Sequence, residues 1–156
     1  GLSLDAGEVG FKRPGMALTL NGIAQGYITD RIAALLRAQG LRDVLVDIGE
    51  VVALGHKSDG APWRAGIAAP DGRVVRRLVV SDRALATSAP QGTRLADGQG
   101  HILDPRGHGP RQHLVSVSAP DAALADGLST ALCLLDRQAG QRMTRGFPGT
   151  AIEVIA

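Results

Sequence analysis

Two pairs of polar residues in this chain have types and spacings that suit metal binding or acid–base catalysis. Asp126 and Thr130 lie four positions apart in an apolar stretch that predicts a helix, so both side chains fall on one helix face. A carboxylate with a hydroxyl is an oxygen-only ligand pair, which suits Mg²⁺ or Ca²⁺ and not zinc. The structural alternative is that Asp126 favours the helix dipole while the Thr130 hydroxyl bonds to a backbone carbonyl.

The second pair is His101 and Asp104, in a loop segment that ends at Pro105. Histidine titrates near neutral pH, so His101 could act as a general base. Both residue types are also common in turns, and a role in shaping the loop is the alternative. His108 and His113 follow nearby, but the group lacks the cysteines or the paired helical spacing of a zinc site.

A helix expected over residues 21–39 carries two unusual glycines, Gly22 and Gly26. Each costs about 1 kcal/mol relative to alanine inside a helix, which favours a role in which another group approaches the backbone. Asn21 is expected to cap this helix, and its unpaired N–H groups favour an anion such as phosphate. Close packing of the helix on a strand explains the glycines equally well. Gly40 suits the left-handed position after the helix end.

Apolar residues recur along this helix at helical spacing and predict one apolar face. They are Ile23, Tyr27, Ile28, Ile32, Leu35 and Leu36. Further helices are expected at 120–135 and 137–145, and strands at 2–4, 9–12, 43–48, 51–54, 63–68, 74–81, 114–118 and 151–154. The strands at 43–48 and 51–54 are expected to be buried, and residues 70–72 (Pro-Asp-Gly) to form a hairpin turn. Leu128, Leu132 and Leu135 are expected to pack against the sheet. No regular element is assigned to residues 83–113. Hairpin-like strands with helices between them predict an α+β fold, with a mixed or antiparallel sheet and two to three packed helices.

Length and composition set limits on function. The chain of 156 residues is one domain's worth, and 44% hydrophobic with 21% charged residues is typical of a globular protein. Net charge is +2, the arginines are scattered and aromatic residues make up only 3%, which argues against a nucleic-acid partner.

Cys133 lies in an apolar run and is expected to be buried and inert. No apolar run approaches the ~20 residues of a membrane span. The chain starts at Gly1 without a signal-peptide pattern, so a processed or trimmed N-terminus is expected.

Five segments in order resemble the FAD:protein FMN transferase family, known as ApbE. They are residues 21–30 (Asn-Gly-Ile-Ala-Gln-Gly-Tyr followed by Asp30), 43–55, 86–88 (Ala-Thr-Ser), 101–105 (His-Ile-Leu-Asp-Pro) and 125–132 (Ala-Asp-Gly-Leu-Ser-Thr-Ala-Leu). The resemblance implies an ApbE-like, T-fold-like α+β domain over residues 1–156, corresponding to the C-terminal part of a flavin-transferase-like chain. A specialised version of such a flavin transferase occurs among the maturation proteins of nitrous oxide reductase.

The resemblance also implies a reaction. A threonine or serine of a target flavoprotein attacks the FMN-side phosphorus of FAD in the presence of Mg²⁺, and AMP is released. FAD is then a substrate, and the family's usual compartment, the periplasm, is expected, with membrane association possible through a segment preceding this chain.

The family motifs assign roles to particular residues. Asp126, Thr130 and the backbone carbonyl of Ala24 would hold Mg²⁺, with Asp126 essential for catalysis and His101 as the base. The cofactor-binding residues would be Asn21, Gly22, Gln25, Gly26, Thr87, Ser88 and Asp104.

Three features depart from the family pattern. Gln25 stands where the family usually has lysine, so a positive charge near the diphosphate is missing. The segment Asp47–Glu50 is one glycine shorter than usual, and Glu50 takes the acidic place. The family chain is also longer on its N-terminal side. The alternatives are a non-catalytic flavin- or nucleotide-binding module, an inactive fragment, or a structural half-domain that works only with a separate chain.

Overall fold

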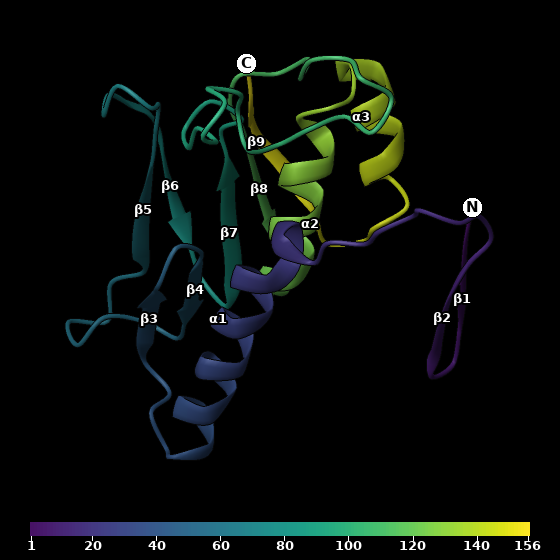
Figure 1. Ribbon diagram of the computed structural model, residues 1–156. Coiled ribbons are helices and arrows are strands. Elements are labelled where there is room, and N and C mark those ends of the chain that lie inside the picture. Colours follow the sequence, from purple (N-terminus) through teal and green to yellow (C-terminus); the bar gives the residue numbers. More distant parts are fainter.

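The computed structural model describes all residues 1–156, which form three antiparallel sheets and three helices (Figure 1). The main sheet has the strand order β3-β4-β7-β8-β9, and every neighbouring pair in it is antiparallel. Its strands are β3 (Val44–Asp47), β4 (Val51–Leu54), β7 (Arg83–Ser88), β8 (Val115–Ala119) and β9 (Ala151–Ile155). The expected α+β class with an antiparallel sheet is therefore confirmed.

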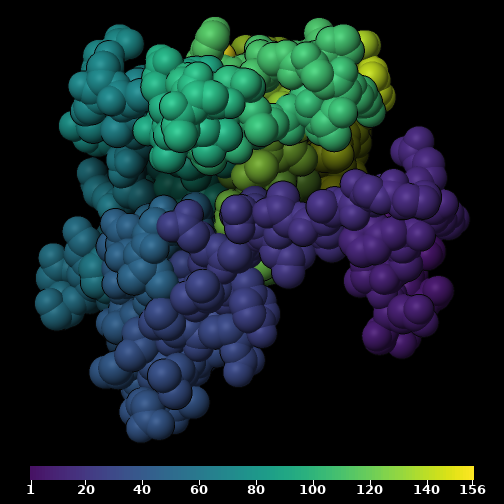
Figure 2. Space-filling model, viewed as in Figure 1, coloured from purple at the N-terminus to yellow at the C-terminus, as the bar shows by residue number.

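Two hairpins stand outside the main sheet. One pairs β1 (Leu2–Asp5) with β2 (Glu8–Phe11), and the other pairs β5 (Trp63–Ala68) with β6 (Val74–Val80). The β5–β6 hairpin turns where the sequence predicts it, with Gly72 at a φ of +84°. The β1–β2 hairpin projects from the side of the body, and the segment after it runs across the body to the first helix (Figure 2).

The helices are α1 (Asn21–Ala38), α2 (Ala122–Leu132) and α3 (Arg137–Thr144), close to the expected ranges. Helix α2 packs along β7 and β8, and its leucines Leu128 and Leu132 meet Val115 and Val117 of β8 in a buried cluster, with Leu135 at its margin. The expected packing of these leucines on the sheet is confirmed. No helix combines the length and the apolar content needed to cross a membrane.

Helices α1 and α2 touch almost backbone to backbone. Gly26 on α1 lies so close to the first turn of α2 that an added Cβ would stand 2.8 Å from the Cα of Ala123. Both carboxylate oxygens of Asp30 accept hydrogen bonds from α2, at 2.7 Å from the Ala122 N–H and 2.9 Å from the Ala123 N–H. Asp30 thus satisfies two of the unpaired N–H groups at the start of α2. Close packing therefore explains Gly26, although the partner is a helix and not the strand considered from the sequence.

The expected cap of α1 is wrong. Asn21 is already in the helix, and no side chain caps its start. The Asn21 N–H instead donates to the Thr19 hydroxyl at 3.2 Å. At the other end Gly40 has a φ of +88° and its N–H donates to the Arg37 carbonyl, so its predicted left-handed role is confirmed.

The apolar face predicted for α1 is only partly the buried one. Ile32 and Leu36 pack against the core cluster beneath the helix. The fully buried residues are Gly26, Thr29 and Ala33, because the short distance to α2 admits only small side chains. The remaining apolar residues of the predicted face are exposed; they are Ile23, Tyr27, Ile28 and Leu35.

Strand β7 is the element without a counterpart in the sequence-based assignment, yet it is the central strand of the main sheet. Its residues Ala84 and Ala86 are buried beneath α2, and Leu85 is buried on the opposite face of the strand against Ile67 of β5. The segment is too rich in small residues to show the alternation that marks a half-exposed strand. The structure also places β3 at the sheet edge, where Val46 is its one buried residue, so the expectation of a buried strand there is wrong.

Cys133 follows α2 and has no solvent exposure, and it is unpaired, as the sequence predicts. Its thiol contacts the carbonyl oxygen of Ser129 at 3.3 Å. Burial raises the pKa of Cys133 to about 12, so the reactive thiolate is scarce at neutral pH.

The helix contact yields a stability prediction. Gly26→Ala should lower the free energy of unfolding by about 1–3 kcal/mol, because the new methyl group meets backbone atoms of α2 and the helices must separate. Intrinsic propensity alone gives the opposite sign, a gain of about 1 kcal/mol. Urea denaturation measures the difference, with Ala34→Gly on the exposed side of α1 as the reference for pure propensity. A Gly26→Ala variant as stable as the parent would contradict this contact.

Candidate functional site

A pocket of about 510 Å³ opens where α1, α2 and the end of β7 converge. This volume lies within the range of about 300–1,000 Å³ that is usual for ligand sites. The start of α1, the β3–β4 turn, the end of β7, the loop 89–103 and the inward face of α2 form its walls. The lining residues are Thr19, Asn21, Gly22, Gln25, Glu50, Thr87, Ser88, Ala89, Gly92, Thr93, His101, Ile102, Leu103, Asp126, Thr130 and Leu134.

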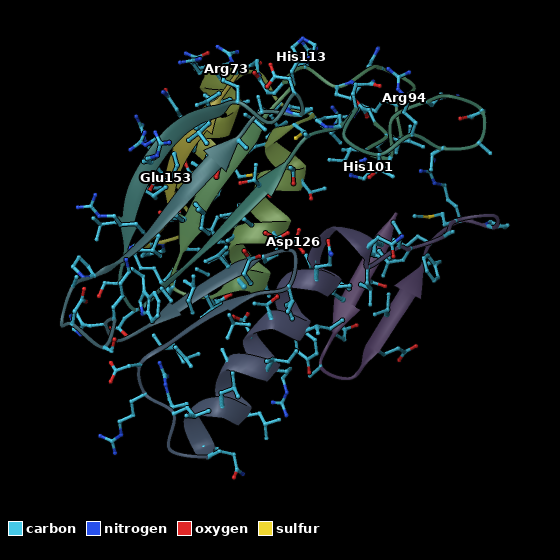
Figure 3. All side chains as sticks on the ribbon, turned by 90° about the vertical axis from the view of Figure 1, so that its left-hand side faces the viewer. Arg73, Arg94, His101, His113, Asp126 and Glu153 are labelled. Carbon is cyan, nitrogen blue, oxygen red and sulfur yellow. The ribbon has the colours of Figure 1, made fainter.

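Most of the site residues expected from the sequence line this one pocket, although they come from four distant segments. They are Asn21, Gly22, Gln25, Thr87, Ser88, His101, Asp126 and Thr130. Gly26, Ala24 and Asp104 are not among the lining residues. Figure 3 shows Asp126 on α2 beside the start of α1, with His101 on the long loop.

Asp126 is 6% exposed and faces α1. Its Oδ2 accepts a hydrogen bond of 3.0 Å from the Gly26 N–H, which leaves Oδ1 for another partner. Burial raises the pKa of Asp126 above its usual range, and the hydrogen bond from Gly26 offsets part of the rise. Gly26 therefore acts in the site through its N–H group, which holds the Asp126 carboxylate in place.

The Thr130 hydroxyl belongs to a chain of hydroxyls between α2 and β7. Ser88 Oγ lies 3.3 Å from Thr130 Oγ1 and 2.7 Å from Ser129 Oγ. This chain replaces the bond to a helix carbonyl that the structural alternative assigned to Thr130. Gly22 keeps the space open in front of this residue, since an added Cβ would lie 3.0 Å from the Thr130 methyl.

The Ala24 carbonyl remains a predicted ligand. Ala24 is half-buried, and the pocket is lined by Gly22 and Gln25 on either side of it in the sequence.

His101 is exposed at the pocket wall, and its imidazole Nδ1 lies 3.2 Å from the Thr93 carbonyl oxygen. A carbonyl oxygen can only accept, so this hydrogen bond requires the proton on Nδ1. In the neutral ring the lone pair is then on Nε2. The loop therefore fixes the tautomer in which Nε2 can take a proton.

Asp104 shapes the loop and does not face the pocket. Its Oδ1 accepts from the Arg106 N–H at 2.9 Å, and its carbonyl accepts from the Gly107 N–H at 2.9 Å. These bonds are those of a turn residue, which agrees with the loop-shaping alternative. Direct binding of a cofactor by Asp104 stays a prediction without support from this geometry.

Glu50 is the important pocket residue that the sequence-based site set omitted. It lies in the β3–β4 turn directly after Gly49, whose φ of +115° only glycine adopts readily, and it is 6% exposed. Burial, the nearby Asp126 carboxylate and, more weakly, Asp47 raise the pKa of Glu50 to about 8, although a hydrogen bond from the Thr87 N–H opposes the rise. A single glutamate after a glycine gives no sequence signal for this burial, which results from the packing of the turn on α1 and β7.

The donor set of the pocket fits a hard divalent cation. Asp126 and Glu50 provide carboxylate oxygens and Thr130 a hydroxyl, and oxygen ligands are those that Mg²⁺ prefers. The structure contains no cluster of three or more His, Cys, Asp and Glu side chains suited to a metal.

A larger hollow of about 790 Å³ lies elsewhere, between β6, α3 and β9. Its walls carry Arg76, Arg137 and Arg145, and its one carboxylate, Glu153, is paired with Arg76 at 2.8 Å. This groove lacks a candidate base and a free carboxylate, so the smaller pocket is the better candidate for catalysis.

The ApbE family model matches residues 1–154, and the chain belongs to the ApbE family. Curated relatives named FAD:protein FMN transferase include those of Klebsiella pneumoniae, 32% identical over 85% of this chain and 41% of that protein, and Treponema pallidum, 35% identical over 86% and 42%. The chain thus spans about two fifths of the length of these relatives.

Solved structures show the same fold. The flavin transferase ApbE of Vibrio cholerae superposes with a TM-score of 0.78 at 28% identity, covering 97% of this chain and 50% of that one. The apo form of the Pseudomonas stutzeri flavinyl transferase ApbE gives a TM-score of 0.72 at 33% identity, covering 92% and 46%. A match to half of each longer chain is consistent with the expected C-terminal portion.

The raised pKa of Glu50 predicts a pH dependence of stability. Between the ordinary value of 4.5 and the folded value of about 8, the folded state holds a proton that the unfolded state has lost. The free energy of unfolding should therefore fall as pH rises through this window, by up to about 1.4 kcal/mol per pH unit. The pKa of Asp126 is also raised, so its ionisation lowers the free energy of unfolding further at the acidic end of this pH range.

Urea denaturation from pH 5 to pH 9 in the presence of EDTA tests this, with Glu50→Gln as the variant that cannot ionise. Subtracting its curve from that of the parent removes the contribution of the histidines. Exposed Glu8 in β2 provides the control, since Glu8→Gln should leave the slope nearly unchanged. A parent and a Glu50→Gln variant with the same pH slope would show that Glu50 titrates normally.

Proposed function

We propose that the protein transfers FMN from FAD to a threonine or serine hydroxyl of a target flavoprotein, with Mg²⁺, and releases AMP. The observation that carries the proposal is the convergence of Asp126, Thr130 and His101 on one pocket in a chain of the ApbE family. The names of the relatives support flavin transfer from FAD to protein. The oxygen donors of the pocket support the choice of metal, and the acceptor residue and the released nucleotide are proposed on the family resemblance.

The reaction exchanges the phosphoanhydride bond of FAD for a phosphoester bond to the acceptor. The acceptor oxygen forms a bond to the FMN-side phosphorus, and the bond from that phosphorus to the bridging oxygen breaks. AMP leaves with the bridging oxygen, and the acceptor hydroxyl loses its proton. Phosphoryl transfer of this kind depends on positioning and on neutralising the phosphate oxygens.

His101 is the group placed to receive the acceptor proton. Its Nδ1–H is held by the Thr93 carbonyl, so Nε2 carries the lone pair, and the residue lines the pocket. Its exposure suits a base that must meet a residue of another protein, since that residue enters from solvent.

Asp126 and Thr130 would hold Mg²⁺, which supplies charge neutralisation at the diphosphate when bound. The Gly26 N–H and the hydroxyls of Ser88 and Ser129 fix the orientation of these two residues before any ligand arrives. Asn21 and Gln25 present amides at the same rim and can donate hydrogen bonds to phosphate oxygens.

The periplasm is the compartment we propose, on the family resemblance alone. The partner is then an exported or membrane-bound flavoprotein.

The decisive measurement is the mass of an acceptor protein after incubation with FAD and Mg²⁺, with AMP followed in parallel. Because the chain spans about two fifths of its curated relatives, the assay uses the protein as its gene encodes it. Asp126→Ala should abolish transfer by removing a metal ligand. His101→Ala should slow transfer by about 10²–10⁴-fold and leave FAD affinity nearly intact.

His108→Ala is the matched control, since His108 lies in the same long loop but outside the pocket. Tight FAD binding without modification of any acceptor would favour a flavin-binding module. Full transfer by Asp126→Ala would leave the chemistry possible but move it away from this pocket.

A further inference from the structure

Glu50 has an orphaned oxygen. Its Oε2 is the one buried side-chain polar atom in the structure that has no hydrogen-bond partner. An unpaired buried acceptor costs about 1–3 kcal/mol, and more when charged, so such an atom usually has a partner that only arrives with a ligand. The side chain is more than nine-tenths buried and lines the pocket.

The surroundings of Glu50 hold negative charge and no compensating cation. Asp126 faces the same space from α2 and Asp47 lies on the strand before the turn. The two ion pairs of the structure, Arg73–Asp71 and Arg76–Glu153, lie elsewhere. No lysine or arginine is among the residues that line the pocket. Two buried carboxylates in this setting repel each other and would repel a diphosphate.

The turn that carries Glu50 is built to keep it there. Gly49 adopts a φ of +115°, and an added Cβ would stand 2.7 Å from Nε2 of Gln25, so the α1 side chain lies directly over the turn. On the other side the Thr87 N–H engages the carboxyl group. These contacts hold the turn in place, and Oε2 of Glu50 has no hydrogen-bond partner within the protein.

We propose that Glu50 is a further ligand of the divalent cation at Asp126 and Thr130, so that the cation is held by two carboxylates and a hydroxyl. The inference rests on the proposed function for the cation itself and adds a residue to its binding site. A divalent cation satisfies Oε2 and cancels the charge of Glu50 and Asp126 together. One or two carboxylates with water or phosphate in the remaining positions is the usual environment of Mg²⁺.

The two-carboxylate site has a consequence for the order of binding. At a pH above about 8, where Glu50 is ionised, its carboxylate and that of Asp126 attract a divalent cation in the absence of nucleotide, whereas the diphosphate of FAD meets net negative charge until the cation is bound. The protein should therefore bind the cation first and on its own.

The test is titration of the purified chain with Mn²⁺ in the absence of nucleotide. Free Mn²⁺ is followed by its electron paramagnetic resonance signal, and Mg²⁺ is added afterwards as a competitor. Glu50→Gln and Asp126→Asn should each weaken Mn²⁺ binding by about 10–100-fold or more, the range typical of losing a group that supports a metal site. Asp59→Asn, which removes an exposed carboxylate outside the pocket, should stay within about twofold of the parent.

Thermal unfolding checks that each variant is folded. Without metal at pH 8, Glu50→Gln should be at least as stable as the parent, because a buried charge is removed. Saturating Mn²⁺ should raise the Tm of the parent more than that of the variant.

Each outcome decides a different claim. If Asp126→Asn loses Mn²⁺ and Glu50→Gln does not, the cation site stands and the role of Glu50 is overturned. If neither variant loses Mn²⁺, or the parent binds none at millimolar concentration, the cation site of the proposed function is overturned as well.

Discussion

The contact between α1 and α2 at Gly26 is the constraint on which the site depends. Because Gly26 has no side chain, its N–H reaches Asp126 in α2, and Asp30 one turn later reaches the first N–H groups of α2. These hydrogen bonds fix both the distance between the two helices and the position of one helix along the other. The start of α1 is then held opposite the Asp126–Thr130 face, which is the geometry that the pocket requires.

Much of the fold follows from local sequence patterns, since the helices, both hairpins and four of the five strands of the main sheet appear close to their expected positions. Strand β7 could not be found this way, because burial on both of its faces replaces alternation with a run of small residues. The close contact between α1 and α2 explains why the larger apolar residues of α1 are exposed while Thr29 and Ala33 are buried. Helical periodicity identifies a face, but the distance to the neighbouring helix decides which residue sizes that face can bury.

The site was predictable to the extent that family motifs identify residues one at a time. His101, Asp126, Thr130 and Ser88 come from separate segments, and only the fold shows that they share a pocket. The position of Asp104 in a turn and the burial of Glu50 are products of tertiary packing, which motif matching does not report. The sequence likewise does not show where charged side chains gather on the folded protein. The chain is weakly basic in total, yet Arg76, Arg137 and Arg145 gather in the groove beside β9 while the pocket holds two carboxylates.

The buried Cys133 has a practical consequence for following this protein in motion. Its thiol is enclosed and its pKa is about 12, so alkylating dyes and spin labels do not compete for it under ordinary conditions. The natural chain therefore already behaves as a cysteine-free background. A single cysteine placed on the exposed part of the β1–β2 hairpin would carry the only reactive handle, which makes fluorescence or distance measurements between this hairpin and a bound flavin accessible without altering the core.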